Sequence, residues 1–209
     1  MPSLSDNYAY LIVNRATSEA VAVDAGEPAV VAAAALSLGC ALVAVLTTHY
    51  HADHSGGNAE LAAAHKNLEI VAGDADADAT PGPVTRRVVD GEAFVAAGLA
   101  FQALHTPGHT PGHTCFLLDA RDGQAPAVFT GDCLFVGGCG RLLAGTAAEM
   151  RQSLSSLAAL EPATRVFPGH EYGGRVGARP LEKRAGRSDA PSSSAAVGRV
   201  AATPRVPRG

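Results

Sequence analysis

The feature that most constrains this chain is a cluster of polar residues directly after a buried strand. Residues 41–46 form a continuous apolar run of strand length, which is typical of a strand covered on both faces. Shortly after this run come four potential metal ligands within six residues: His49, His51, Asp53 and His54. Imidazoles and carboxylates are metal ligands, and such a dense group is rare by chance, so the sequence predicts a metal site at the end of this strand.

Other candidate ligands follow predicted strands in the same way. His109 lies in a loop with two Pro-Gly turns, between two apolar runs. Asp132 and His170 each come shortly after a short apolar run. Because ligand sites in α/β proteins lie at strand ends, we expect these side chains to meet the first cluster at a common edge.

Seven candidate ligands are more than one ion takes, since a single metal rarely uses more than four protein ligands. The sequence therefore predicts two metal ions, with Asp132 as the bridging carboxylate. Imidazole and carboxylate ligands suit zinc, iron or manganese. We expect two divalent ions per chain, with zinc as the first choice. His113, in the same loop as His109, is predicted to support the site rather than to bind an ion.

Short apolar runs alternate with helical stretches along the chain. Further strands are predicted at 8–13, 19–24, 69–72, 86–89, 99–104, 115–119, 127–130 and 165–167, and helices at 28–38, 59–66 and 147–160. Strands followed by helices in both halves indicate an α/β layered architecture. The pattern leaves the strand topology open.

Charge divides the chain into a body and a tail. The net charge is −4, but residues 1–172 carry 8 Lys and Arg against 18 Asp and Glu, whereas residues 173–209 carry 8 against 2. The second segment is rich in Gly, Pro, Ser and Ala, a composition typical of a poorly ordered end. We expect a folded catalytic domain at 1–172 and a basic, poorly ordered tail at 173–209.

Composition also restricts the partners. An acidic body argues against nucleic acid, whose phosphates it would repel. No apolar run approaches the roughly 18 residues that a membrane span needs, and the first ten residues do not resemble a secretory signal. The four Cys are scattered, as in proteins of a reducing compartment. We expect a monomer that contacts neither nucleic acid nor membrane, in the cytoplasm, with the mitochondrion left open.

The motifs resemble those of a known family. Thr48 to His54, followed by Gly56-Gly57-Asn58, is similar to the signature of the metallo-β-lactamase superfamily. Segments 6–8, 106–114, 129–141 and 168–172 resemble glyoxalase II, the hydroxyacylglutathione hydrolases. The resemblance covers nearly all of residues 1–172. It implies an αββα sandwich and a binuclear metal centre.

The resemblance also implies an activity, the hydrolysis of S-lactoylglutathione to D-lactate and glutathione by a hydroxide that two metals share. His49, His51 and His109 would hold one ion, and Asp53, His54 and His170 the second. Asp132 would bridge them and, with Asp53, would be catalytic. The substrate contacts that the resemblance implies are Arg141, Leu142, Leu143, His170, Glu171 and Tyr172.

Two features depart from the family pattern. Family members continue into a helical region that supplies basic groups for glutathione, and the tail at 173–209 shows no such pattern, so we expect most of that region to be lacking. Leu143 stands where many members have Tyr. Two alternatives to the hydrolase follow. One is a truncated metal-binding protein with little activity, and the other is a mononuclear-iron persulfide dioxygenase, which the complete second ligand set argues against.

Overall fold

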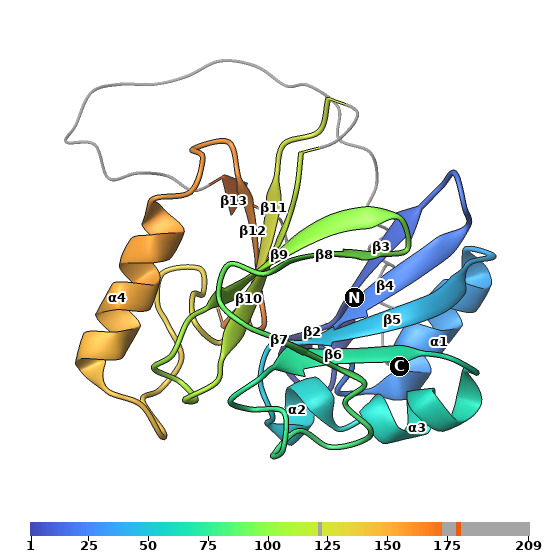
Figure 1. The fold of residues 1–209 in the computed structure, drawn as a ribbon, viewed down its shortest axis with the longest axis horizontal. Helices are drawn as coiled ribbons and strands as arrows, with labels where there is room; N and C mark the ends of the chain where they lie inside the picture. The colour runs from blue at the N-terminus through green and yellow to red at the C-terminus, as the bar shows by residue number, and fades with distance from the viewer. Residues whose placement is uncertain (121–122, 173–178, 181–209) are drawn as a thin grey trace, which may run out of the picture.

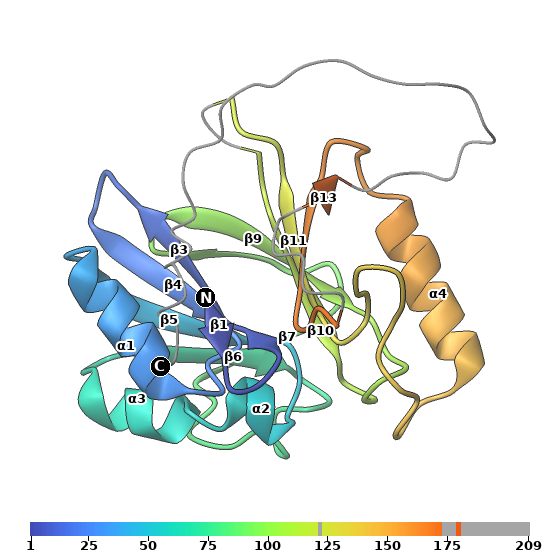
Figure 2. The ribbon, with the colours of Figure 1, turned by 180° about the vertical axis from the view of Figure 1, so that it is seen from behind.

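The structure, a computed structural model, describes residues 1–120, 123–172 and 179–180. Two β-sheets face one another, and helices cover their outer sides (Figures 1 and 2). The chain therefore forms the αββα sandwich that its motifs imply, and the prediction of an α/β layered fold is confirmed.

The first sheet holds the metal-ligand motif predicted from the sequence. Its strands, in spatial order, are β3 (Tyr10–Asn14), β4 (Glu19–Val23), β5 (Ala41–Thr47), β6 (Glu69–Gly73) and β7 (Arg86–Val88). β3 and β4 are antiparallel, and the other neighbours are parallel. Parallel strands need crossover connections, and helices supply the first two: α1 (Pro28–Ser37) joins β4 to β5, and α2 (Ala52–Ser55) with α3 (Asn58–Ala64) joins β5 to β6.

The second sheet is mostly antiparallel. Its strands, in spatial order, are β13 (Arg179–Pro180), β12 (Arg165–Pro168), β11 (Ala127–Gly131), β10 (Thr114–Leu118), β9 (Leu99–His105) and β8 (Ala93–Ala96). β11 and β12 are parallel, and α4 (Ala147–Ala158) connects them. Thr146 and Glu149 form a capping box at the start of α4, which fixes where this helix begins. A small separate sheet pairs β1 (Pro2–Ser3) with β2 (Asn7–Tyr8).

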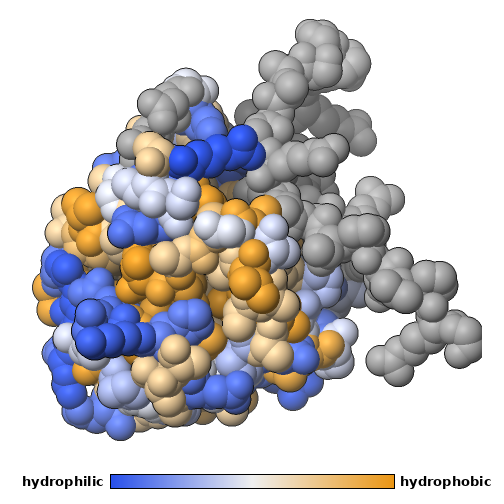
Figure 3. All heavy atoms as spheres, turned by 90° about the vertical axis from the view of Figure 1, so that its right-hand side faces the viewer, coloured by the Kyte–Doolittle hydropathy of each residue, from blue (hydrophilic) through white to orange (hydrophobic). Residues whose placement is uncertain are grey.

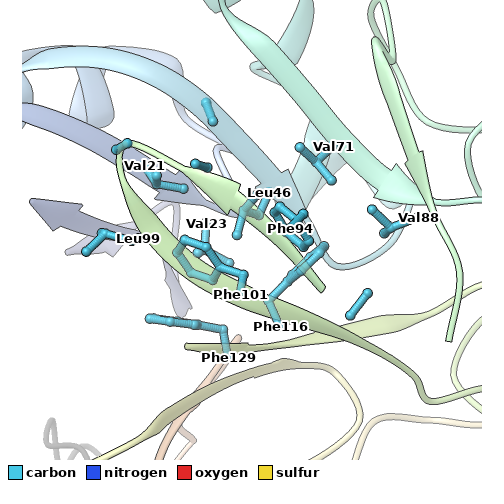
Figure 4. Close-up of a cluster of buried hydrophobic side chains, with 14 of the residues drawn as sticks. Val21, Val23, Leu46, Val71, Val88, Phe94, Leu99, Phe101, Phe116 and Phe129 are labelled. Atoms are coloured by element: carbon cyan, nitrogen blue, oxygen red, sulfur yellow. The ribbon is translucent and has the colours of Figure 1, made fainter. Parts of the chain in front are cut away.

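Three buried clusters hold the four layers together. The largest lies between the sheets, where Val21 and Leu46 of the first sheet face Phe101 and Phe116 of the second (Figure 4). The second cluster joins the outer face of the first sheet to α1 and α3, and the third joins the second sheet to α4. Each sheet is thus covered on both faces, which explains the continuous apolar run in β5.

Helix α1 differs from an ordinary surface helix because its sequence is apolar on all sides. Val31 is buried, whereas Leu36 near its end is 82% exposed. The face of the molecule on the side of α1 and α3 accordingly carries a central hydrophobic area with hydrophilic residues around it (Figure 3). No helix within the described ranges is long and apolar enough to cross a membrane.

Strand β13 lies within the segment predicted as a tail, 173–209. The other residues of that segment lie outside the described part of the chain, so the division into a catalytic domain and a tail stays a prediction.

Candidate metal centre

The predicted ligands come together at one edge of the sandwich. The motif at 49–54 follows β5 and continues into α2, the loop with His109 connects β9 to β10, and Asp132 and His170 follow the parallel strands β11 and β12. Both sheets therefore contribute to a single site. Two glycines allow the close approach: a Cβ at Gly131 would collide with Thr48, and one at Gly169 would lie 2.7 Å from His54 Cε1.

Three imidazoles form what we call the first ligand group: His49, His51 and His109. His51 Nδ1 lies 3.0 Å from His49 Nε2 and 3.0 Å from His109 Nε2. His49 and His109 are buried, and His51 is half-buried. Three ring nitrogens therefore lie close enough together to bind one ion.

The second ligand group consists of Asp53, His54 and His170. Asp53 Oδ2 lies 3.3 Å from His54 Nε2 and 3.4 Å from His170 Nε2, and the two ring nitrogens are 3.2 Å apart. His54 and His170 are buried, whereas the Asp53 side chain is 40% exposed. This group has the same compact geometry as the first but carries a carboxylate.

Asp132 lies between the two groups with one oxygen directed at each. Its Oδ2 is 3.3 Å from His109 Nε2, in the first group. Its Oδ1 is 3.3 Å from His54 Nε2 and 3.4 Å from His170 Nε2, in the second. This placement is what a carboxylate shared between two ions requires.

The donor set fits a pair of divalent ions. Two ligand atoms bound to one zinc ion at a tetrahedral angle lie about 3.3 Å apart, close to the separations within each group. Asp132 Oδ1 is buried and accepts no hydrogen bond from the described residues. A buried carboxylate oxygen without a hydrogen bond is costly, and a cation at this point would satisfy it.

Burial and charge control the protonation of the ligands. Burial and the neighbouring imidazoles lower the pKa of His49 well below its usual value, which keeps this ring neutral. Burial would also lower the pKa of His54, but Asp24, Asp132 and Asp53 outweigh it and raise that pKa. The pKa of the Asp53 carboxyl is lowered by its hydrogen bonds with His170 and His54. The carboxylates are therefore ionised at neutral pH, as metal ligands must be.

Outer contacts hold several ligands in place. His54 Nδ1 lies 3.0 Å from Oδ2 of buried Asp24, which also accepts hydrogen bonds from the backbone and hydroxyl of Thr48. His49 Nδ1 faces Thr48 Oγ1 at 3.1 Å, and His109 Nδ1 donates to the Arg141 carbonyl at 2.7 Å. Such contacts fix the orientation of the ring and the nitrogen that can bind a metal.

His113 supports Asp132 and lies outside both ligand groups. The backbone N–H of Asp132 donates to His113 Nε2, so Nδ1 carries the proton and faces Thr106 Oγ1 at 2.9 Å. Burial lowers the pKa of His113 to about 3, which keeps the ring in this neutral form. Its position behind the ligands agrees with the sequence prediction.

Sequence reasoning assigned no supporting role to three residues: Asn7, Asp24 and Asp76. Asn7 Nδ2 donates to Asp53 Oδ2 at 2.9 Å. Asp76 is buried and accepts hydrogen bonds from the Thr110 hydroxyl and the Gly112 backbone, both in the His109 loop. Asp24 is the last residue of the strand predicted at 19–24 and directly follows β4, and an acidic residue at a strand end is a signal that could have identified it. Asn7 belongs to segment 6–8, which carries the family resemblance, but its contact with Asp53 joins segments far apart in the sequence, as do the contacts of Asp76, so no local pattern reveals these contacts.

The candidate substrate contacts lie around the ligand groups and differ in how exposed they are. The Tyr172 ring stacks on His170 with 5.6 Å between centroids and lies edge-on to Phe135 at 5.7 Å. Arg141 is exposed next to His109, and Leu142 lines a cavity of about 440 Å³ against α4. Leu143 is 59% exposed, and Glu171, next to His170, is half-buried.

The family profile of the metallo-beta-lactamase superfamily matches residues 4–170. The chain belongs to this superfamily. With the cluster of His and Asp residues, membership indicates a binuclear metal site and confirms the superfamily resemblance drawn from the motifs.

Curated relatives confirm the resemblance to glyoxalase II. The chain is 39% identical over 174 residues to the cytoplasmic hydroxyacylglutathione hydrolase of Arabidopsis thaliana, and 43% identical over 169 residues to the hydroxyacylglutathione hydrolase of Rhodospirillum rubrum. These matches cover 82% and 81% of this chain. The chain spans 66% and 64% of the length of the two relatives, less than two thirds in each case.

Solved structures share the fold. ETHE1 from Myxococcus xanthus matches 85% of this chain and 76% of its own, with 32% identity and a TM-score of 0.72. TTHA1623, solved in a di-iron-bound form, matches 84% of this chain and 90% of its own, with 33% identity and a TM-score of 0.65.

Proposed function

We propose that this protein is a thioester hydrolase with two divalent metal ions, and that its substrate is S-lactoylglutathione or a similar 2-hydroxyacylglutathione. The observation that carries the proposal is the position of Asp132, with one carboxylate oxygen directed at each ligand group. The names of the relatives support the choice of a glutathione thioester. Zinc is the proposed metal, and iron and manganese suit the same ligands.

The proposed roles follow from the geometry. His49, His51 and His109 would hold one ion, Asp53, His54 and His170 the other, and Asp132 both. Two such ions, when bound, lower the pKa of water and polarise the attacked carbonyl. Asp132 and Asp53 keep the site anionic, and His113 holds the backbone of Asp132 in place.

The thiol beside the shared carboxylate is not placed to act as a nucleophile. Cys133, next to Asp132, is fully buried in the cluster beneath α4, so its thiol cannot reach a substrate. The leaving group of a thioester is a thiolate, which departs without a proton from the protein. The chain therefore needs only to position the ions and the substrate.

The substrate would lie across the exposed side of the two groups. Arg141 can pair with a glutathione carboxylate, and Tyr172 offers a hydroxyl and an exposed ring. We also propose contacts with Leu142, Leu143, His170 and Glu171. The described site has few cationic side chains, so we expect weak binding of glutathione. We also propose that the protein is a cytoplasmic monomer with its catalytic domain at 1–172.

A hydrolysis assay with S-lactoylglutathione tests the proposal. We expect release of glutathione by the zinc-loaded protein and its loss after removal of metal with a chelator. A folded protein with two bound ions and no turnover would refute the hydrolase and favour the metal-binding alternative. One iron per chain with oxygen consumption in the presence of glutathione persulfide would instead show the dioxygenase.

A further inference from the structure

We propose that Asp6 and Asn7 are positioning residues for the second ligand group, and that they raise its affinity for a divalent ion without affecting the first group. The inference rests on the two-metal part of the proposed function. It assigns a role to a segment near the N-terminus, far in sequence from every ligand that it contacts.

The backbone fixes this segment against the second ligand group. Asn7 pairs with His170 across an isolated antiparallel bridge, and the backbone N–H of Tyr8 donates to the Gly169 carbonyl at 2.8 Å. Gly169 in turn donates its N–H to the Gly131 carbonyl at 2.9 Å, next to Asp132. Residues 6–8 are therefore held in register with the strand end that carries His170.

Asn7 orients the carboxylate of Asp53. Its side chain is buried, and Nδ2 donates to Asp53 Oδ2 at 2.9 Å and to the Asp53 backbone carbonyl at 3.2 Å. An amide is neutral, so this contact fixes the carboxylate without cancelling its charge. A Lys or Arg in the same place would pair with the carboxylate and compete with a metal ion. Asn thus suits a residue that prepares Asp53 to bind a cation.

Asp6 acts on the other side of the group. Its Oδ1 lies 3.3 Å from His170 Nδ1, on the ring edge opposite the nitrogen that faces Asp53. The two atoms lie within ion-pair distance, but His170 Nδ1 makes no hydrogen bond with the described residues. Asp6 therefore acts through its charge, which stabilises the positive charge that the imidazole gains when it binds an ion.

The two ligand groups differ in what lies behind them. Both imidazoles of the second group have a carboxylate at the far nitrogen, Asp24 behind His54 and Asp6 behind His170. In the first group, the far nitrogens of His49 and His109 face the Thr48 hydroxyl and the Arg141 carbonyl, which are uncharged. Loss of Asp6 or Asn7 should therefore weaken only the second group.

Competitive titration of the metal-free protein with Co²⁺ tests the proposal, because each bound ion has its own visible absorption. Asp53→Asn and His51→Ala identify the signals of the second and first groups. We expect Asp6→Asn and Asn7→Ala to lower the Co²⁺ affinity of the second group, which Asp53→Asn identifies, by about 10- to 100-fold. The affinity of the first group should not change. Asp6→Glu, which keeps the charge, should restore part of the affinity.

Glu27→Gln is the matched control. Glu27 accepts a hydrogen bond from the backbone of Leu4, which lies in the same turn as Asp6. The Glu27 side chain is not part of either ligand group. We expect this variant to bind both ions like the wild type. Asp6 is 44% exposed, so Asp6→Asn should fold even if Asn7→Ala does not.

Three results would overturn the inference: an equal loss of Co²⁺ affinity at both groups, a loss at the first group alone, or the same loss in Glu27→Gln. These results differ from failure of the proposed function. A wild-type protein that binds only one ion would refute the two-metal site itself. Selective weakening in a protein that does not hydrolyse thioesters would refute the hydrolase and leave the role of Asp6 and Asn7 intact.

Discussion

Asp76 gives the sharpest prediction about how the fold holds the metal centre. Its side chain is buried in the loop after β6 and accepts two hydrogen bonds from the His109 loop, from the Thr110 hydroxyl at 2.6 Å and from the Gly112 backbone at 2.8 Å. Thr110 directly follows His109 in the sequence. Asp76 therefore ties the loop of one ligand to the first sheet.

The expected cost of Asp76→Ala follows from these two contacts. A hydrogen bond to a charged group contributes about 1.5–3 kcal/mol, and a buried donor left without a partner costs a similar amount. We expect the substitution to lower the free energy of unfolding by at least about 3 kcal/mol, out of a total of about 5–15 kcal/mol for a domain. The change should also weaken binding at the first ligand group.

Urea unfolding of the metal-free protein, followed by circular dichroism, measures this free energy. Asp78→Ala is the matched control, because Asp78 lies in the same loop but pairs with Arg87 at the surface. An exposed pair contributes little, so the control should unfold like the wild type. Equal stability of Asp76→Ala and Asp78→Ala would refute the assignment of Asp76 as the tie between the two loops.

Three further predictions test other parts of the structure. Burial lowers the pKa of His113 to about 3, whereas the unfolded value is about 6.5, so between these values only the unfolded chain gains this proton on acidification. The free energy of unfolding of the metal-free protein should therefore fall by up to about 1.4 kcal/mol per pH unit between about pH 6 and 3. The same slope in His113→Gln would contradict this. Thr146→Ala removes the capping box of α4 and should cost about 1 kcal/mol in thermal or urea unfolding; no loss would show that the cap is dispensable. Gly169→Ala places a methyl group 2.7 Å from His54 Cε1 and 2.9 Å from Asp132 Oδ1, and should lower the metal content, whereas Gly138→Ala, with no atom within 4 Å, should not; equal metal content in both would contradict the close approach.

Much of the fold follows from the spacing of apolar residues. The run at 41–46 becomes β5, and the helix predicted at 147–160 becomes α4, because burial of these residues agrees with their periodicity. Strand β8 was not predicted. It is short, half of its residues are exposed, and the turn that joins it to β9 places Ala97 at a φ of 50°, a conformation that usually requires Gly or Asn.

The metal centre is predictable where one strand end carries its own ligands. His49 to His54, Asp132 and His170 each follow an apolar run, and the structure brings all of them together. The supporting contacts are not predictable in this way. Asn7 meets Asp53 across 46 positions and Asp76 meets Gly112 across 36, so only the tertiary packing of separate elements places them together.

The number of metal ions per chain, measured by elemental analysis in the wild type and in Asp132→Ala, tests the central claim most directly. Asp132 is the one carboxylate of the described ligand set that reaches both groups. We predict close to two ions in the wild type, with fewer ions and no thioester hydrolysis in Asp132→Ala. Two ions and full hydrolysis in Asp132→Ala would contradict the bridging role on which the proposed function depends.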